Sequence, residues 1–198
     1  MKDRKKAEIT LAYEKVASLC ARTQLFTGWT RQAIWNLIKG SFEQNPREMI
    51  DLLPPQLSDK RRKGRHWSSG YCYIIAEVAK IMLCGAGFAY KSFVSPNPRK
   101  KACKTHWVLI KDREVFDPKR VEPSFSRYSR FRGKAFQFRH PSKRAVTLFE
   151  RVLKFGLSNS QVGFQKDRIA VAEELLSRIP DFRLALKTAE QKHSRKRS

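Results

Sequence analysis

The sequence predicts an α+β fold in which a small antiparallel sheet packs on one central, nucleophile-bearing helix, with helical extensions at both ends. Three observations lead to this prediction. Apolar residues recur at helical spacing in both terminal parts of the chain, whereas short segments in the middle alternate as strands do. The chain has 198 residues, of which 41% are hydrophobic, and this is enough for one well-buried core.

We expect a single domain over residues 1–190, because no internal repeat or low-complexity linker divides the chain. Within it, residues 1–55 and 156–190 are expected to be helical, and residues 56–155 to hold the chemical core. The basic residues at 191–198 are expected to form a disordered tail.

Two helices and a short turn are predicted before the core. The first helix covers residues 5–22. The second follows Thr30, its expected N-cap, and carries an apolar stripe made of Ile34, Trp35, Ile38 and Phe42. A short turn or helix then runs to Leu53 and ends at Pro54-Pro55, because proline lacks the amide hydrogen that a helix needs.

The core is expected to contain one helix and three strands. Ser68 or Ser69 is the expected N-cap of a helix that runs from about Gly70 to Cys84. Strand-like segments follow, and a tight turn at Lys111-Asp112-Arg113 joins the last two; the three segments are residues 88–94, 105–110 and 114–117.

The C-terminal part is expected to be mainly helical. Pro180 separates the last two predicted helices, because proline disrupts the helix interior. The predicted elements are, in order, a loop with an edge strand at 124–140, a helix at 141–154, a loop at 156–163, a helix at 166–178 and a helix at 182–192.

The chain is strongly basic: 42 lysine and arginine residues stand against 18 aspartate and glutamate residues, a formal net charge of +24. Such a charge favours polyanions through counterion release. We therefore expect nucleic acid, or a nucleic-acid-bound protein, as a partner. The candidate contacts lie in a basic loop and in a segment where cations alternate with rings such as Tyr128; they are Lys60, Arg61, Arg62, Lys63, Arg65, Arg127, Arg130, Arg132, Lys134 and Arg139. The alternative is a solvated loop followed by ordinary core aromatics.

The cysteines and the N-terminus indicate an intracellular environment. None of the four cysteines is in a CxxC pair, and the basic N-terminus is not followed by the apolar core of a secretory signal. No apolar run approaches the roughly 18 residues of a membrane span, so no membrane association is expected. We expect the cytoplasm of a host cell, with a virion or nucleoid as further options.

Three residues suggest nucleophilic chemistry: Cys72 at a helix start, His106 on a strand and Asp117 on the next strand. A thiol in the first helical turn lies where amide groups and the helix dipole favour the thiolate. If the hairpin turn is centred between Asp112 and Arg113, His106 and Asp117 lie diagonally on one face. A slip of one residue would place them on opposite faces.

The expected roles follow from these positions. Cys72 attacks an acyl carbon, His106 transfers the proton, and Asp117 holds the imidazole. The backbone N–H of Cys72 and a second donor would form the oxyanion hole; the candidate second donors are Gln56, His66 and Trp67.

The other cysteines receive different interpretations. Cys20 and Cys84 are expected to be structural. Cys103 and His106 have the C-x₂-H spacing of half a zinc site, but no second close pair completes it. We therefore predict no metal and no cofactor.

The motifs around the three residues resemble a family of small phage-encoded proteins with a Gly-His-Cys-Tyr, His-Trp and Asp-Pro pattern. The resemblance places that family within the transglutaminase-like or papain-like group of cysteine enzymes. The resemblance covers roughly residues 50–155, and it implies a Cys-His-Asp site. Tyr71 stands where the pattern has histidine. The motifs that carry the resemblance are Gly-Tyr-Cys-Tyr-Ile-Ile-Ala-Glu-Val from residue 70, Thr-His-Trp-Val-Leu from 105, Val-Phe-Asp-Pro from 115 and Pro-Ser-Lys-Arg-Ala from 141.

Two functions are therefore predicted. The first is a thiol-dependent acyl-transfer enzyme, phage- or virus-encoded, that acts as a hydrolase, deamidase or transferase on a protein or peptide acyl substrate. The second is a basic nucleic-acid-associated binding protein, or a virion or structural protein, in which the triad is inactive or incidental. The sequence does not choose the reaction or the oligomeric state.

Overall fold

The computed structural model describes most of the chain from residue 25 onward. The predicted helix at 5–22 lies outside the described residues. The described ranges are 25–53, 67–68, 70–83, 88–94, 105–121, 123–128, 142–159 and 161–194.

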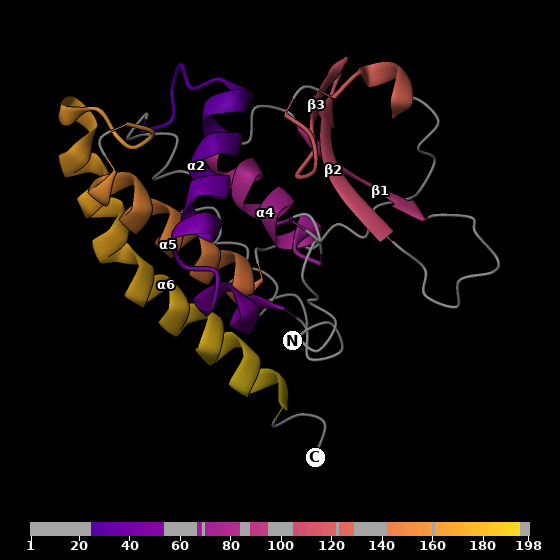
Figure 1. The fold of residues 1–198 in the computed structure, drawn as a ribbon. Coiled ribbons are helices and arrows are strands. Elements are labelled where there is room, and N and C mark those ends of the chain that lie inside the picture. Colours follow the sequence, from indigo (N-terminus) through magenta and orange to yellow (C-terminus); the bar gives the residue numbers. More distant parts are fainter. Residues whose placement is uncertain are drawn as a thin grey trace.

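The protein has the predicted α+β fold, in which four helices accompany one small antiparallel sheet within the described residues. Figure 1 shows the sheet on one side of the molecule and the last helix on the other, with the remaining helices between them. The elements are α2 (Arg31–Gln44), η1 (Glu48–Leu52), α4 (Cys72–Met82), β1 (Ala89–Val94), β2 (Thr105–Lys111), β3 (Glu114–Phe116), η2 (Phe125–Arg127), α5 (Lys143–Ser158), η3 (Lys166–Arg168) and α6 (Ile169–Ser194).

Helix α4 is the centre of the structure. It contacts β2 on one side and α2 and α5 on the other. A helix that is apolar all round is stable only when it is enclosed, and α4 fits this rule. Its buried residues are Cys72, Ile74, Ile75, Ala76, Glu77, Val78, Ala79, Ile81 and Met82.

The sheet has the order β1-β2-β3, and all pairs are antiparallel. Ile110 pairs with Val115 and Lys111 with Glu114, so the turn contains only Asp112 and Arg113. Asp112 has φ 50°, a left-handed conformation that aspartate tolerates better than most residues. The predicted two-residue turn and its register are therefore confirmed.

The two faces of the sheet have different partners. Trp107, Leu109 and Phe116 belong to the main core with the helices. Val108 and Val115 form a second cluster with Tyr128, and Ile110 and Phe125 pack against it. Since side chains alternate along a strand, His106 lies on the same face as Val108.

The predicted helix after Thr30 is confirmed. The Thr30 side chain accepts a hydrogen bond from Ala33 N at 3.1 Å, and the predicted apolar stripe is buried. Two other helix boundaries differ from the prediction. Neither Ser68 nor Ser69 caps α4, because its N-cap is Tyr71, without a side-chain capping bond. Helix α5 continues to Ser158, into the predicted loop.

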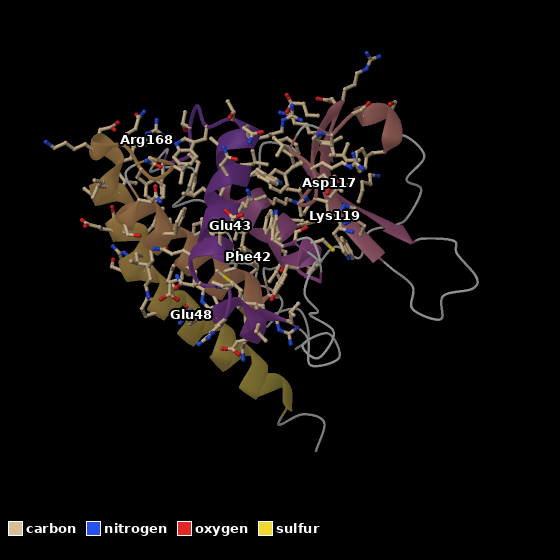
Figure 2. The ribbon with its side chains drawn as sticks, viewed as in Figure 1. Phe42, Glu43, Glu48, Asp117, Lys119 and Arg168 are labelled. Atoms are coloured by element: carbon tan, nitrogen blue, oxygen red, sulfur yellow. The ribbon has the colours of Figure 1, made fainter. Side chains whose placement is uncertain are left out.

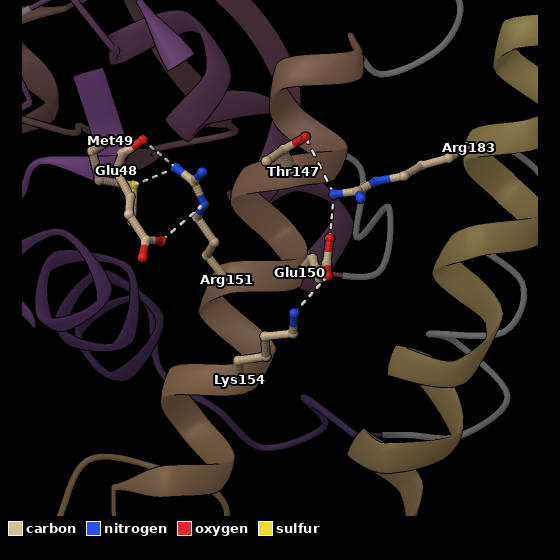
Figure 3. Close-up of polar contacts among 7 residues, drawn as sticks. All are labelled: Glu48, Met49, Thr147, Glu150, Arg151, Lys154 and Arg183. Carbon is tan, nitrogen blue, oxygen red and sulfur yellow. Dashed lines mark hydrogen bonds and ion pairs between the residues drawn. The ribbon is translucent and has the colours of Figure 1, made fainter. Parts of the chain in front are cut away.

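The prediction that Pro180 separates two helices is wrong, because α6 continues through it from Ile169 to Ser194. Contacts with α5 explain the continuation. Ile179 is buried before the proline, and beyond it Arg183 forms an ion pair with Glu150 and a hydrogen bond with Thr147 of α5 (Figure 3). Anchors on both sides of Pro180 offset its missing amide hydrogen. The predicted tail at 191–198 also begins inside α6, and residues 195–198 lie outside the described ones.

A buried carboxylate joins α4 to the start of α5. Glu77 is 2% exposed, and its Oε2 accepts from Ser142 Oγ at 2.6 Å. Its Oε1 accepts from Ser142 N at 3.1 Å and from Tyr73 Oη at 2.9 Å. Burial raises the pKa of Glu77, and the hydrogen bonds from Ser142 and Tyr73 oppose this rise. Ser142 also caps α5 by accepting from Ala145 N at 3.2 Å, so one serine serves both elements.

Substitution of Ser142 should therefore cost more than loss of an ordinary helix cap. We expect Ser142→Ala to lower the free energy of unfolding by roughly 2–3 kcal/mol, since it removes a cap and leaves a buried carboxylate oxygen without that donor. Thr30→Ala, which removes the exposed cap of α2, is the matched control and should cost about 1 kcal/mol. Urea unfolding of both variants checks this; equal losses would contradict the role of Glu77.

Candidate active site

The candidate nucleophile, Cys72, is the first residue of α4. Gly70, with φ 89°, makes the turn that leads into the helix, a conformation that favours glycine. Tyr71 N donates to Ser68 O at 3.0 Å, and Ile75 N donates to Tyr71 O at 3.0 Å. The thiol is buried, with 8% of the residue exposed. Cys72 therefore lies at the positive end of a helix dipole, beside the amide groups of the first helical turn.

The candidate base and acid are in direct contact. His106 Nε2 and Asp117 Oδ1 are 2.7 Å apart, a short charge-assisted hydrogen bond in which the ring nitrogen donates to the carboxylate. His106 comes from β2, and Asp117 follows β3 directly. The predicted diagonal contact is present because the two-residue turn sets the register.

Asp117 is held by two further donors. Lys119 N donates to Oδ1 at 2.7 Å, and Tyr128 Oη donates to Oδ2. The residue is 2% exposed, so each of these bonds replaces one that water would otherwise provide. Figure 2 shows Asp117 and Lys119 close together beside the sheet. Both oxygens of this carboxylate are therefore fixed in place.

The electrostatics of the pair follow from this geometry. Burial lowers the pKa of His106, but the hydrogen bond to Asp117, followed by the contributions of Cys72, raises it to about 9. Burial likewise raises the pKa of Asp117, but His106, Tyr128 and the amide of Lys119 hold it below its ordinary value. At neutral pH the site therefore holds a carboxylate next to an imidazolium.

Cys72 completes the set, since it lies close enough to His106 to raise the histidine pKa by both hydrogen bonding and charge. Asp117 occupies Nε2, and the other ring nitrogen, Nδ1, is buried without a well-aligned hydrogen bond to any described residue. Nδ1 is thus the ring atom available to the thiol. Contacts between nucleophile and base are often loose before a substrate binds.

The ring of Tyr73, next to Cys72, packs edge-on against Trp107, next to His106, with centroids 4.9 Å apart. This contact ties the start of α4 to β2 directly beside the candidate catalytic residues. Trp67, a predicted oxyanion donor, packs its ring against Trp35 and Phe42 in the core. The other two candidate donors, Gln56 and His66, lie outside the described residues.

Two important contacts were not predicted. Tyr128 was grouped with the rings that alternate with cations, yet it is 3% exposed and bound to Asp117, so it is unavailable for base stacking. Glu77 had no predicted partner, and Ser142 is 65 residues away in the chain. The sequence signal that could have identified this contact is the spacing of 11 residues between Asp117 and Tyr128, because a short loop can bring the chain back over that distance.

The predicted nucleic-acid contacts lie outside the described part of the chain, except for the backbone of Arg127 in η2; those outside are Lys60, Arg61, Arg62, Lys63, Arg65, Arg130, Arg132, Lys134 and Arg139. The predicted structural cysteines Cys20 and Cys84, and Cys103 of the zinc half-site, also lie outside it. Among the residues that are described, no three His, Cys, Asp or Glu side chains gather as metal ligands.

The His106–Asp117 pair should make stability depend on pH. Folding raises the pKa of His106 from about 6.5 to about 9. The protonated histidine therefore stabilises the folded state fully below about pH 6.5, and this stabilisation is lost as the pH rises through about 9. A Cys72→Ser background removes the contribution of the thiol to the His106 pKa, so the loss then comes from the Asp117 interaction, and we expect it to be about 1–3 kcal/mol. Urea unfolding of Cys72→Ser against Cys72→Ser/His106→Gln, from pH 6 to pH 9.5, measures it.

The control for this experiment is Asp117→Asn in the same background. It removes the charged partner, so the difference between the histidine and glutamine forms should then vary little with pH. A difference that is independent of pH with Asp117 present would contradict the pair.

Comparison with known proteins does not supply a family for this site. Neither a family model, nor a curated protein, nor a solved structure matches this chain. The resemblance to phage-encoded cysteine enzymes therefore stays a prediction. Interpretation of the site rests on the geometry of Cys72, His106 and Asp117.

Proposed function

We propose that the protein is a cysteine-dependent acyl-transfer enzyme in which Cys72 is the nucleophile, His106 the proton carrier and Asp117 the residue that orients it. The observation that carries this proposal is the position of His106, which binds Asp117 at 2.7 Å through Nε2 and interacts with Cys72. A nucleophile, a base and a group that orients the base are the three parts this chemistry needs.

The proposed reaction has two halves. The Cys72 thiolate attacks the acyl carbon and forms a C–S bond, while the His106 imidazolium gives its proton to the departing amine or alcohol as the original C–N or C–O bond breaks. In the second half a water or amine loses a proton to His106 and attacks the thioester, which releases Cys72. Water makes the enzyme a hydrolase or deamidase, and an amine makes it a transferase.

The surroundings of the site support this chemistry. The charge that develops on the acyl oxygen would lie near the amide groups at the start of α4, where the helix dipole is positive. Asp117 stabilises the positive charge on His106 without taking its proton, because its own pKa is lowered. The side chain of His106 is 16% exposed, so water is largely excluded from the ion pair.

Alkylation of Cys72 tests the proposed nucleophile. We expect iodoacetamide to label Cys72 at pH 6.5 about tenfold faster than an ordinary thiol, because the helix N-terminus and the neighbouring His106 stabilise the negative charge of the attacking sulfur. Peptide mass spectrometry separates Cys72 from Cys20, Cys84 and Cys103. His106→Ala should reduce labelling to that of an ordinary thiol, and Asp117→Asn should give an intermediate rate.

The control is His193→Ala, near the C-terminal end of α6. It should leave labelling unchanged. Cys72 labelling that is no faster than that of an unperturbed thiol and is unaffected by His106→Ala would rule out the proposed site.

A small activated ester then tests acyl transfer itself. We expect p-nitrophenyl acetate to leave one acetyl group on Cys72, with a burst of nitrophenolate that Cys72→Ser abolishes. Release of the acetyl group in buffer measures hydrolysis, and faster release on addition of a primary amine indicates a transferase. A Cys72 that is never acetylated would contradict the acyl-enzyme step.

The second candidate function is polyanion binding, which the net charge of +24 favours. In the described part of the chain, Lys119 and Arg120 are exposed two and three residues after Asp117, so cations lie near the candidate site as well as in the predicted basic loop. A substrate bound to nucleic acid would make the two functions compatible.

Binding to generic DNA and RNA should fall steeply with salt. We expect a loss of about 100-fold or more between 50 and 200 mM salt, because each neutralised phosphate releases a counterion. Replacement of Lys60, Arg61, Arg62, Lys63 and Arg65 by Gln should make the salt slope shallower. Replacement of the tail residues Arg195, Lys196 and Arg197 by Gln is the control, and it should change the slope less. Cys72→Ser should leave binding unchanged, and a slope near zero would remove this function.

A further inference from the structure

Tyr128 follows η2 at the end of a short segment that returns to the sheet. Its N–H donates to Phe125 O at 2.8 Å, which ends the single helical turn. The ring is 3% exposed and packs with Val108 and Val115. Tyr128 therefore covers the sheet face that carries His106, from a segment outside the hairpin.

The two carboxylate oxygens of Asp117 accept hydrogen bonds from different partners. Oδ2 accepts from Tyr128, while Oδ1 accepts from His106 Nε2 and from the amide of Lys119. A carboxylate that receives hydrogen bonds on one oxygen only can rotate about its Cβ–Cγ bond. The Tyr128 bond opposes this rotation and keeps Oδ1 directed at His106.

We propose that Tyr128 is a positioning residue of the active site, which acts through Asp117 to keep His106 oriented toward Cys72. This inference rests on the proposed function. Without the hydroxyl, the buried Oδ2 loses its donor from the described residues, and Asp117 either turns or takes up a proton. Both outcomes weaken the hydrogen bond between His106 Nε2 and Asp117 Oδ1, so the histidine loses its fixed tautomer and orientation.

The packing of the ring and the action of the hydroxyl can be separated. Tyr128→Phe keeps the ring against Val108 and Val115 and removes only the hydroxyl. Tyr90→Phe is the matched control, because Tyr90 packs against the main core rather than in the cluster around Tyr128. Both variants should give the far-UV circular dichroism spectrum of the original protein.

The first readout is the alkylation rate of Cys72 at pH 6.5. We expect Tyr128→Phe to slow it by about three- to tenfold and Tyr90→Phe to leave it unchanged. In an Asp117→Asn background, Tyr128→Phe should have no further effect, since the two substitutions remove the same interaction. Equal effects in both backgrounds would show a role for Tyr128 independent of Asp117 and would overturn the inference.

The second readout does not depend on reactivity. The low-field Nε2–H proton resonance of His106 reports its hydrogen bond to Asp117, and it should be lost on acidification when Asp117 takes up a proton. We expect the midpoint to lie about one pH unit higher in Tyr128→Phe than in the original protein. An unchanged midpoint would overturn the inference.

The outcomes also distinguish this inference from the proposed function. If Cys72 is labelled slowly and His106→Ala has no effect, the proposed function fails. If labelling depends on His106 and Asp117 while Tyr128→Phe behaves like Tyr90→Phe, the function stands and the role of Tyr128 is wrong.

Discussion

The candidate site depends on the burial of one carboxylate. Asp117 is 2% exposed, and it is ionised only because His106, Lys119 and Tyr128 direct donors at it. These donors come from β2, from the turn after β3 and from the end of η2. The same bonds that orient His106 therefore also join the hairpin to the segment that follows it, so local structure and site geometry share one cause.

A second buried carboxylate, Glu77, has the corresponding role between α4 and α5. Glu77 binds Ser142 and Tyr73, and this fixes the start of α5 on the central helix. The ring of Tyr73 also contacts Trp107 of β2. Tyr73 thus connects the helix layer to the strand that carries His106, and it does so one residue away from Cys72.

Among the described residues, none of the helices is both long and apolar enough to cross a membrane.

The parts of the structure that short-range rules govern could be predicted from the sequence. The hairpin register follows from a two-residue turn and the alternation of side chains, and it brings His106 to Asp117. The α2 cap at Thr30 follows from the preference of threonine for that position. In each case the interacting residues are close in the chain, so the pattern of residue types contains the necessary information.

Contacts between distant segments could not be predicted in this way. Tyr128 has the sequence context of a ring among cations, and only the path of the returning segment brings it to Asp117. Ser142 was an expected helix start, but its bond to Glu77 spans 65 residues. Pro180 was expected to end a helix, and Arg183, paired with Glu150 of α5, supports the helix beyond it. In all three, tertiary contacts decide what local propensity leaves open.

The charge of the chain and the chemistry of the site are connected. A net charge of +24 produces a positive field that favours anions at the surface. The same field disfavours the imidazolium of His106, so an unpaired histidine would lose its proton more easily. The buried carboxylate of Asp117 counteracts this effect at His106. Tyr128 and the amide of Lys119 keep that carboxylate ionised and directed, which allows a strongly basic protein to maintain an imidazolium beside its thiol.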